Sequence, residues 1–302
     1  MRHNKDNVEL NMAQITTQTS TEVTPSDAHN RLIEMWVDGR SPHTQDAYRR
    51  YARQFLAHVN RPLHLVTLAD IQGWKLTLVG LSPNSQRTAI AAIKSLLTFG
   101  HKIGLLPLNV GMPVKQPAAK DCLNERILTE LEVQTLIALE THPRNRAILR
   151  LLYSAGLRVS ELCALTWKDL KVRGDSGQVT AFGKRGKTRT ILLSAGVWVE
   201  LINLRGNAGN DDPVFPSREG DSEGNHLHRS QINRIVLAAA KRAGIKEKVS
   251  PHWLRHAHAS HSLDRGAPIH LVQQTLGHES VATTSRYLHA RPNDSSSLYL
   301  PG

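Results

Sequence analysis

Serine–proline pairs mark three points at which helices are expected to begin along this chain. A serine at the N-cap accepts backbone hydrogen bonds, and a proline at the first helical position loses no intrahelical bond. The pairs stand at residues 41–42, 82–83 and 250–251. Apolar residues then recur at steps of three and four, as at Ile90 and Ile93. The pattern predicts a mainly α-helical chain.

Further boundary signals support the same fold class. Thr129 followed by Glu132 is typical of a capping box, and Gly156 and Gly277 stand where left-handed C-caps are expected. Only residues 179–182 and 190–193 carry a convincing strand pattern, and a glycine-containing basic hairpin, residues 183–188, joins them. We therefore expect a mainly α fold with a small β-sheet or hairpin.

The 302 residues are enough for two domains with separate cores. The first stretch is polar and aperiodic, and a basic, proline-containing stretch later interrupts the helical pattern. Tyr48, Tyr51 and Phe55 are predicted as core aromatics in preference to base-stacking residues. The expected organisation is a flexible tail (1–25), a helical domain (26–111), a basic linker (112–126), a second domain (127–290) and a C-terminal tail (291–302).

The charge balance favours a large polyanion as partner. Lys and Arg number 38 against 26 Asp and Glu, a formal net charge of +12. An anionic membrane would also attract such a chain, but no apolar run approaches the roughly 18 residues of a transmembrane helix, and no secretory signal pattern begins the sequence. We expect a soluble cytoplasmic protein with Cys122 and Cys163 reduced.

Six residues in the second half have the side chains that cleavage of a phosphodiester requires. Transesterification at phosphorus adds charge to the non-bridging oxygens, which arginine forks and imidazoles stabilise. A phenol can attack phosphorus if its proton is removed, and a lysine can protonate the departing oxygen. The residues are Arg158, Lys184, His252, Arg255, His278 and Tyr287.

The spacing of these residues resembles that of the tyrosine recombinase (phage integrase) family, particularly its compact Xer-type members. Residues 153–162 (YSAGLRVSEL) are similar to the first-arginine motif, and 183–189 (GKRGKTR) to the hairpin with the catalytic lysine. Residues 250–256 (SPHWLRH), 276–278 (LGH) and 283–287 (TTSRY) are similar to the second motif box and the nucleophile segment. The resemblance runs from about residue 26 to Tyr287.

The resemblance implies an N-terminal helical core-binding domain of SAM-like fold and a C-terminal catalytic domain of the DNA breaking-rejoining fold, which together clamp double-stranded DNA. Tyr287 would form a 3′-phosphotyrosyl link while Lys184 assists departure of the 5′-hydroxyl, with Glu161 as a supporting residue. Four protomers, as a homotetramer or with a related recombinase, would exchange strands between two specific sites through a Holliday junction. No cofactor and no metal are implied.

Two other functions remain open at this point: a type IB topoisomerase-like nicking and closing enzyme, and a non-catalytic DNA-binding accessory protein. A metal site built on His252 and His256, at i and i+4, is disfavoured because no suitable carboxylate or thiolate stands nearby in the sequence. His256, His258 and His261 are interpreted as packing or surface residues. Tyr153 and Tyr299 are rival nucleophiles, expected to be buried and in a loose tail.

Further basic residues are candidates for phosphate contacts, with a solvated surface position as the alternative. A short C-terminal segment, residues 298–300, would have to dock on a neighbouring subunit if this chain assembles as the family does. The candidate DNA-binding residues are Arg49, Arg50, Arg53, Lys115, Lys120, Arg185, Lys187, Arg229 and Arg234.

Overall fold

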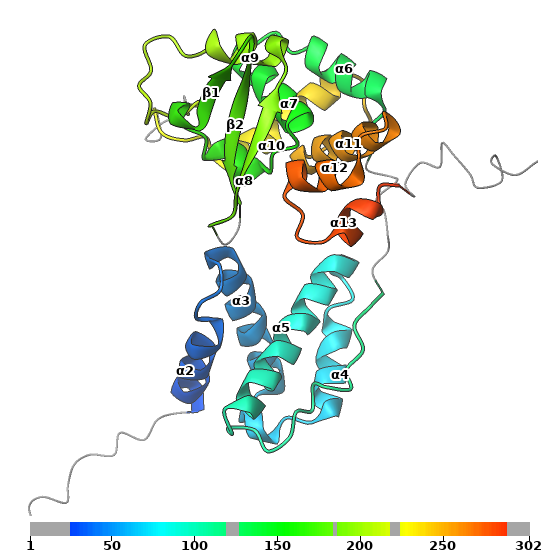
Figure 1. Ribbon diagram of the computed structural model, residues 1–302. Helices are drawn as coiled ribbons and strands as arrows, with labels where there is room; N and C mark the ends of the chain where they lie inside the picture. Colours follow the sequence, from blue (N-terminus) through cyan, green and yellow to red (C-terminus); the bar gives the residue numbers. More distant parts are fainter. Residues whose placement is uncertain (1–24, 119–126, 184–185, 218–223, 289–302) are drawn as a thin grey trace, which may run out of the picture. The chain divides into compact units, whose positions relative to one another are not determined.

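The structure is a computed structural model that describes residues 25–118, 127–183, 186–217 and 224–288 (Figure 1). Its contacts divide the chain into two compact units, Met1–Lys120 and Asp121–Gly302. The described part is mainly helical with one small antiparallel sheet, as predicted. No described helix has the length and apolar character needed to cross a membrane.

The first unit is built from helices around an aromatic core. Its elements are α2 (Pro25–Val37), α3 (Pro42–Val59), a 3-10 turn (Leu63–Leu65), α4 (Leu68–Thr77) and α5 (Pro83–Lys102). Ser41 and Ser82 are the N-caps of α3 and α5, which confirms the two predicted starts. Tyr51 and Phe55 are buried, as expected of core aromatics. Phe55 packs edge-on against Trp74, with ring centroids 5.3 Å apart.

The second unit begins with α6 (Glu130–Ala138), α7 (Pro143–Ser154), α8 (Val159–Cys163) and a 3-10 turn (Trp167–Asp169). The predicted capping box is present, because the Thr129 backbone N–H donates to the Glu132 carboxylate at 2.7 Å. Gly156 has φ +57° directly after α7, which confirms the predicted helix end. This left-handed turn leads the chain from the buried α7 to Arg158.

The sheet contains strands β1 (Leu170–Arg173), β2 (Ser176–Phe182) and β3 (Thr188–Leu193) in the order β1-β2-β3, all antiparallel. The two predicted strands, 179–182 and 190–193, lie within β2 and β3, but the short strand β1 was not predicted. This strand has four residues, of which only Leu170 is buried, so it shows no alternation of apolar and polar residues. On the sheet face, Trp198 lies so close to Gly177 that a Cβ there would be 2.0 Å from the indole ring.

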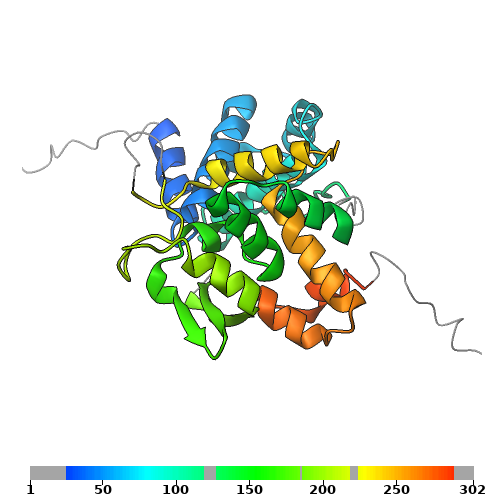
Figure 2. The same cartoon turned by 90° about the horizontal axis from the view of Figure 1, so that it is seen from above.

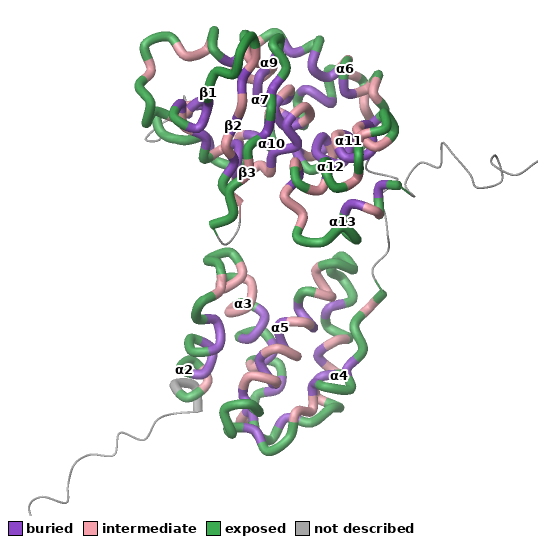
Figure 3. Tube along the Cα trace, viewed as in Figure 1, coloured by how far each residue is buried: buried purple, intermediate pink, exposed green. Residues whose placement is uncertain are grey.

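The remaining helices are α9 (Ala195–Ile202), α10 (Arg229–Arg242), α11 (Pro251–Asp264), α12 (Ile269–Leu276) and α13 (Val281–Ser285). Helix α7 lies at the centre of this unit, with α9, α10 and α11 packed around it (Figures 1 and 2). Its residues Ile148, Leu149, Leu151 and Leu152 are completely buried. Figure 3 draws the buried parts of α7 and its neighbours in purple. The buried apolar face of α7 therefore supports the elements that carry the predicted site.

Candidate active site

Glu161 is the centre of an ion-pair network at the start of α8. Its carboxylate, whose side chain is 3% exposed, accepts from Arg158 Nη1 at 2.8 Å and from the backbone N–H of Arg158 at 2.8 Å. Arg189 of β3 donates two parallel hydrogen bonds to it, at 2.8 and 2.7 Å. Although burial alone raises the pKa of Glu161, the bonds from Arg189 and Arg158 outweigh it and lower the pKa to about 2. The carboxylate therefore stays ionised and fixes both guanidiniums.

The same two guanidiniums hold the end of α12. Arg158 Nη2 donates to the carbonyl of Gly277 at 2.8 Å, and Arg189 Nε donates to the carbonyl of Thr275 at 2.6 Å. The last carbonyls of a helix carry a partial negative charge, which cations stabilise. The network thus joins α8, β3 and α12. Arg189 was not among the predicted site residues, although it stands at the end of the hairpin motif, residues 183–189.

A third arginine, Arg255, also contacts the end of α12, and it is buried, with 2% of its area exposed. Its Nη1 donates to the carbonyl of Gly156 and its Nη2 to the carbonyl of Leu276, both at 2.5 Å. Burial, followed by repulsion from Arg158, lowers the pKa of Arg255 to about 9. The guanidinium is therefore protonated at neutral pH and shares the end of α12 with the other two arginines.

His278 follows immediately after the carbonyls that the arginines hold. Gly277, with φ +62°, ends α12 as predicted and turns the chain so that His278 Nδ1 lies 2.9 Å from the Thr284 hydroxyl. Burial, followed by the positive charges of Arg255 and Arg158, lowers the pKa of His278 to about 4. The imidazole is therefore neutral at pH 7 in the absence of DNA.

Tyr287 lies one residue beyond the C-cap of α13. The prediction that it stands in a short helix was therefore wrong: α13 ends at Ser285, and the Tyr287 backbone N–H donates to the Thr284 carbonyl in the following turn. Its ring is stacked on that of His278, with centroids 6.4 Å apart and planes 6° apart. It is 5% exposed and belongs to a small core with Ile127, Ala259, Val272 and Leu276.

The hydroxyl of Tyr287 lies 2.6 Å from Nδ1 of His256 on α11. His256 is buried, as a packing residue would be, but its contact with the predicted nucleophile was not predicted. Burial raises the pKa of Tyr287, against a smaller opposite effect of Arg255 and Arg286. The one signal in the sequence was the position of His256 next to Arg255; the contact itself joins residues 31 positions apart.

Of the two remaining predicted residues, the structure describes His252 but not Lys184. His252 is exposed at the start of α11, and its ring meets that of His256 edge-on, with centroids 4.4 Å apart. Lys184 lies outside the described residues. Among the described residues on either side of it, the Gly183 N–H donates to the Lys187 carbonyl at 2.7 Å.

The candidate DNA-binding residues lie on several surfaces. Arg49 of α3 is engaged by Glu34 at 2.7 Å, whereas Arg50 and Arg53 on the same helix are exposed. Lys120 and Arg185 lie outside the described residues. The exposed candidates beyond α3 are Lys115, Lys187, Arg229 and Arg234.

Of the two rival nucleophiles, the structure describes only Tyr153. The Tyr153 hydroxyl lies 3.0 Å from His261 Nδ1, and the side chain is partly buried, as expected. Tyr299 is beyond the described residues. Within the described part of the chain, no group of three or more His, Cys, Asp or Glu side chains is arranged to hold a metal ion.

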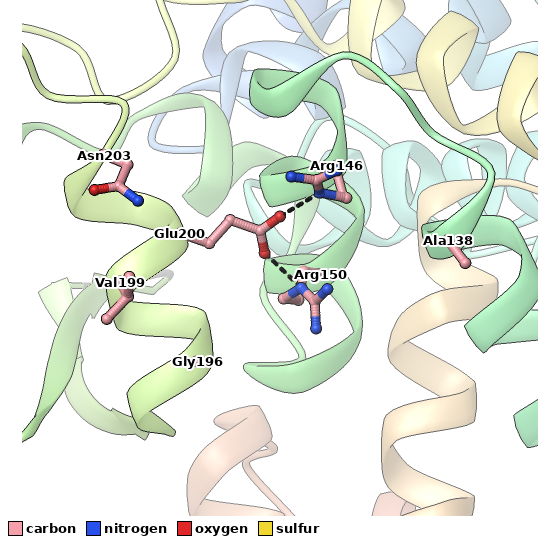
Figure 4. A pocket seen from close by; sticks show the side chains of 7 residues that line it. All are labelled: Ala138, Arg146, Arg150, Gly196, Val199, Glu200 and Asn203. Atoms are coloured by element: carbon pink, nitrogen blue, oxygen red, sulfur yellow. Dashed lines mark hydrogen bonds and ion pairs between the residues drawn. The ribbon is translucent and has the colours of Figure 1, made fainter.

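A cavity of about 510 Å³ lies between α7 and α9, away from the predicted site residues. Glu200 accepts a hydrogen bond from Arg146 Nε at 2.5 Å and forms an ion pair with Arg150, also at 2.5 Å (Figure 4). None of the residues that line it belongs to the motifs quoted above. The cluster holds α7 and α9 together.

Comparisons with known proteins agree with the motifs. Residues 126–294 match the model of the phage integrase family. The chain is 32% identical over 287 residues to a protein named tyrosine recombinase XerC from Xanthomonas campestris pv. campestris (strain B100), with 91% of this chain and 87% of the relative covered.

Solved structures share the fold. XerH site-specific recombinase bound to difH substrate in a pre-cleavage complex has a TM-score of 0.67 at 19% identity, over 90% of this chain and 83% of that one. A lambda integrase tetramer bound to a Holliday junction has a TM-score of 0.68 at 17% identity, over 90% and 85%. The chain therefore belongs to the phage integrase family of tyrosine recombinases, within which it is similar to the Xer-type members.

Proposed function

We propose that this chain is a site-specific DNA recombinase that cuts and rejoins DNA strands through a 3′-phosphotyrosyl intermediate at Tyr287. The observation that supports this most is that Tyr287 stacks on His278, directly beside the α12 end that Arg158 and Arg255 hold. A phenol next to clustered guanidiniums has the components of metal-free phosphoryl transfer.

In the proposed reaction, the Tyr287 oxygen forms a bond to phosphorus and the bond from phosphorus to the 5′-oxygen breaks. The proton leaves the phenol, and Lys184 supplies one to the departing 5′-oxygen. Arg158, with about a third of its side chain exposed, is proposed to donate to the non-bridging oxygens, with Arg255 adding positive charge from beneath. His278 adds a neutral imidazole donor to the same oxygens.

Glu161 and Arg189 are proposed as positioning residues, because they hold Arg158 and the end of α12 in place before DNA arrives. Preorganised donors stabilise developing charge without having to reorganise during the reaction. The energy of the phosphodiester is kept in the covalent link, so the reaction consumes no nucleotide.

The proposed assembly is a tetramer, either of this chain or with a related recombinase, on two DNA sites that exchange strands through a Holliday junction. The lambda integrase structure named above is such a tetramer, and the XerH structure contains its DNA substrate. We further propose residues 26–111 as the core-binding domain, 127–290 as the catalytic domain, and the cytoplasmic nucleoid as the place of action. The net charge of +12 supports a DNA partner.

Neither a nicking-closing topoisomerase nor an accessory DNA-binding protein is favoured. The relatives named above are recombinases and integrases. An accessory protein would be expected to lose a site residue, and all six motif positions are filled.

The test begins with selection of a bound sequence from a random pool of DNA duplexes. A suicide duplex with a nick beside that site is then incubated with the protein, and denaturing gels are used to detect a covalent adduct. The adduct should form with the native chain and be absent with Tyr287→Phe, which keeps the ring in its apolar cluster. Specific binding without any adduct would favour the accessory protein, and relaxation of supercoiled DNA without a second site would favour the topoisomerase.

A further inference from the structure

We propose that His256 is the base that accepts the phenolic proton of Tyr287, and that His252 connects His256 to solvent. This assignment rests on the proposed function, because it describes how the proposed nucleophile is activated. It concerns a residue that the motif set of six does not include.

The contact between the two side chains has the geometry of a proton transfer. Tyr287 Oη and His256 Nδ1 are 2.6 Å apart, short for a hydrogen bond that involves a nitrogen. In the proposed arrangement the phenol donates to Nδ1, and the neutral imidazole carries its ring proton on Nε2. Both side chains are buried, with His256 9% and Tyr287 5% exposed. Bulk water therefore has little access to the proton.

A base is needed at this position because of where the phenol lies. Burial in the apolar cluster raises the pKa of Tyr287, and the opposing charges of Arg255 and Arg286 have a smaller effect. Ionisation ahead of attack is therefore unfavourable, and the proton has to leave as the bond to phosphorus forms. The base must already lie within hydrogen-bonding distance of the hydroxyl, and His256 does.

His278 is less well oriented for this role. Its ring is nearly parallel to the phenol ring, with 6° between the planes and 6.4 Å between the centroids. Its Nδ1 is bonded to the Thr284 hydroxyl. Its pKa of about 4 also makes it a weak proton acceptor.

The proton needs a way out of the buried site, and His252 lies in the right place to provide one. It stands one helical turn before His256 on α11, and the two rings meet edge-on with centroids 4.4 Å apart. His252 is exposed, whereas His256 is buried. The two imidazoles therefore form a short path from the phenol to the surface.

The step balances in both directions. During cleavage, the proton passes from Tyr287 to His256 Nδ1 while the O–P bond forms, and the leaving 5′-oxygen receives a different proton from its own acid. During rejoining, the 5′-hydroxyl attacks, the tyrosine is the leaving group, and protonated His256 returns the proton to the phenolate oxygen. The same residue is thus base for cleavage and acid for rejoining.

The test compares two substitutions that mimic different ring nitrogens. In His256→Asn the side-chain oxygen takes the place of Nδ1 and still accepts from the phenol, but it cannot be protonated. In His256→Gln the polar atom takes the place of Nε2 instead. If His256 only positions the phenol, the Asn variant should form the covalent adduct at the native rate. If it is the base, both variants should be slower by about 100-fold or more, with unchanged DNA binding.

A fluorinated tyrosine at position 287 shows whether His256 acts as the base for the phenol or only packs against it. A more acidic phenol needs less help to lose its proton, so it should restore a large part of the rate in His256→Asn and change the rate of the native background much less. His258→Gln, a loss of another histidine on α11, whose Nδ1 bonds the Tyr153 carbonyl, is the matched control and should show no such rescue.

The outcomes separate the two proposals. A native protein that forms no Tyr287-dependent adduct on its selected site overturns the recombinase function and the base assignment with it. A native protein that forms the adduct, together with His256→Asn at the native rate or without fluorotyrosine rescue, overturns the assignment of His256 alone.

Discussion

Arg189 and Glu161 form a two-pronged ion pair in which both carboxylate oxygens accept from one guanidinium, at 2.8 and 2.7 Å. The side chains are 11% and 3% exposed, so the pair is largely removed from water. Arg189 also donates to the α12 carbonyl of Thr275 at 2.6 Å. One arginine on a strand therefore links a helix start and a helix end within the site.

Arg189→Ala is expected to lower the free energy of unfolding by about 3 kcal/mol, because it leaves part of a buried carboxylate without a partner. Adduct formation should fall as well, since the end of α12 loses one of its donors. The matched control is Arg265→Ala, which removes an exposed pair with Glu130 and should have a much smaller effect on stability. Denaturant unfolding of both variants measures the difference, and equal effects would contradict this account.

Acid should destabilise the protein through Glu161. Its pKa is lowered from 4.5 to about 2 in the folded state, so the unfolded state binds the proton more readily. The stabilisation is present above about pH 4.5 and is lost as the pH falls towards 2. Thermal unfolding followed from about pH 6 down to about pH 2.5 covers most of this window. The unfolding temperature should decline less steeply with falling pH for Glu161→Gln than for the native protein. Glu130→Gln, at an exposed carboxylate, should follow the native curve.

His278 should titrate at unusually low pH. Its pKa of about 4, against 6.5 for the ordinary side chain, means that the unfolded chain takes up its proton first. The native state therefore loses stability as the pH falls from about 6.5 to about 4. Proton-detected NMR of the histidine rings measures the midpoint, and His278→Gln identifies the resonance. A midpoint near 6.5 in the free protein would show that neither burial nor the neighbouring arginines lower the pKa of His278.

Gly277→Ala tests whether activity depends on the close contact between Gly277 and the Arg189 side chain. Gly277 has φ +62°, and an added Cβ would lie 3.2 Å from the Arg189 side chain. Gly266, with φ +81° and nothing within 4 Å of such a Cβ, is the matched control. Both substitutions incur the left-handed backbone cost of about 1–2 kcal/mol. Only Gly277→Ala should also reduce adduct formation; equal activity of the two variants would contradict the fit.

Local signals in the sequence were sufficient for most element boundaries. N-cap residues, first-turn prolines and left-handed glycines act within a few positions, so Ser82, Thr129, Gly156 and Gly277 could be interpreted without tertiary information. Strand β1 was missed for the opposite reason. Its residues are held by pairing with β2, a partner that a four-residue edge strand does not reveal by its own pattern.

The contacts of the site could not be predicted in the same way. His256 and Tyr287 are 31 positions apart, and Arg189 and Glu161 are 28 apart, so these pairs depend on how α11, α13, β3 and α8 pack. Motif spacing indicates which residues share a function. It does not indicate which atoms meet, and the position of Tyr287 beyond α13 was missed for this reason.

The end of α12 concentrates three guanidiniums, Arg158, Arg189 and Arg255, around the single carboxylate of Glu161. Mutual repulsion among the three contributes to the lowered pKa of Arg255. The free protein thus retains unfavourable electrostatic energy at the place where a phosphate is proposed to bind. A bound phosphodiester, being negatively charged, reduces this repulsion, so the repulsion in the free protein contributes to the affinity for DNA. Bound DNA should in turn make the second unit harder to unfold.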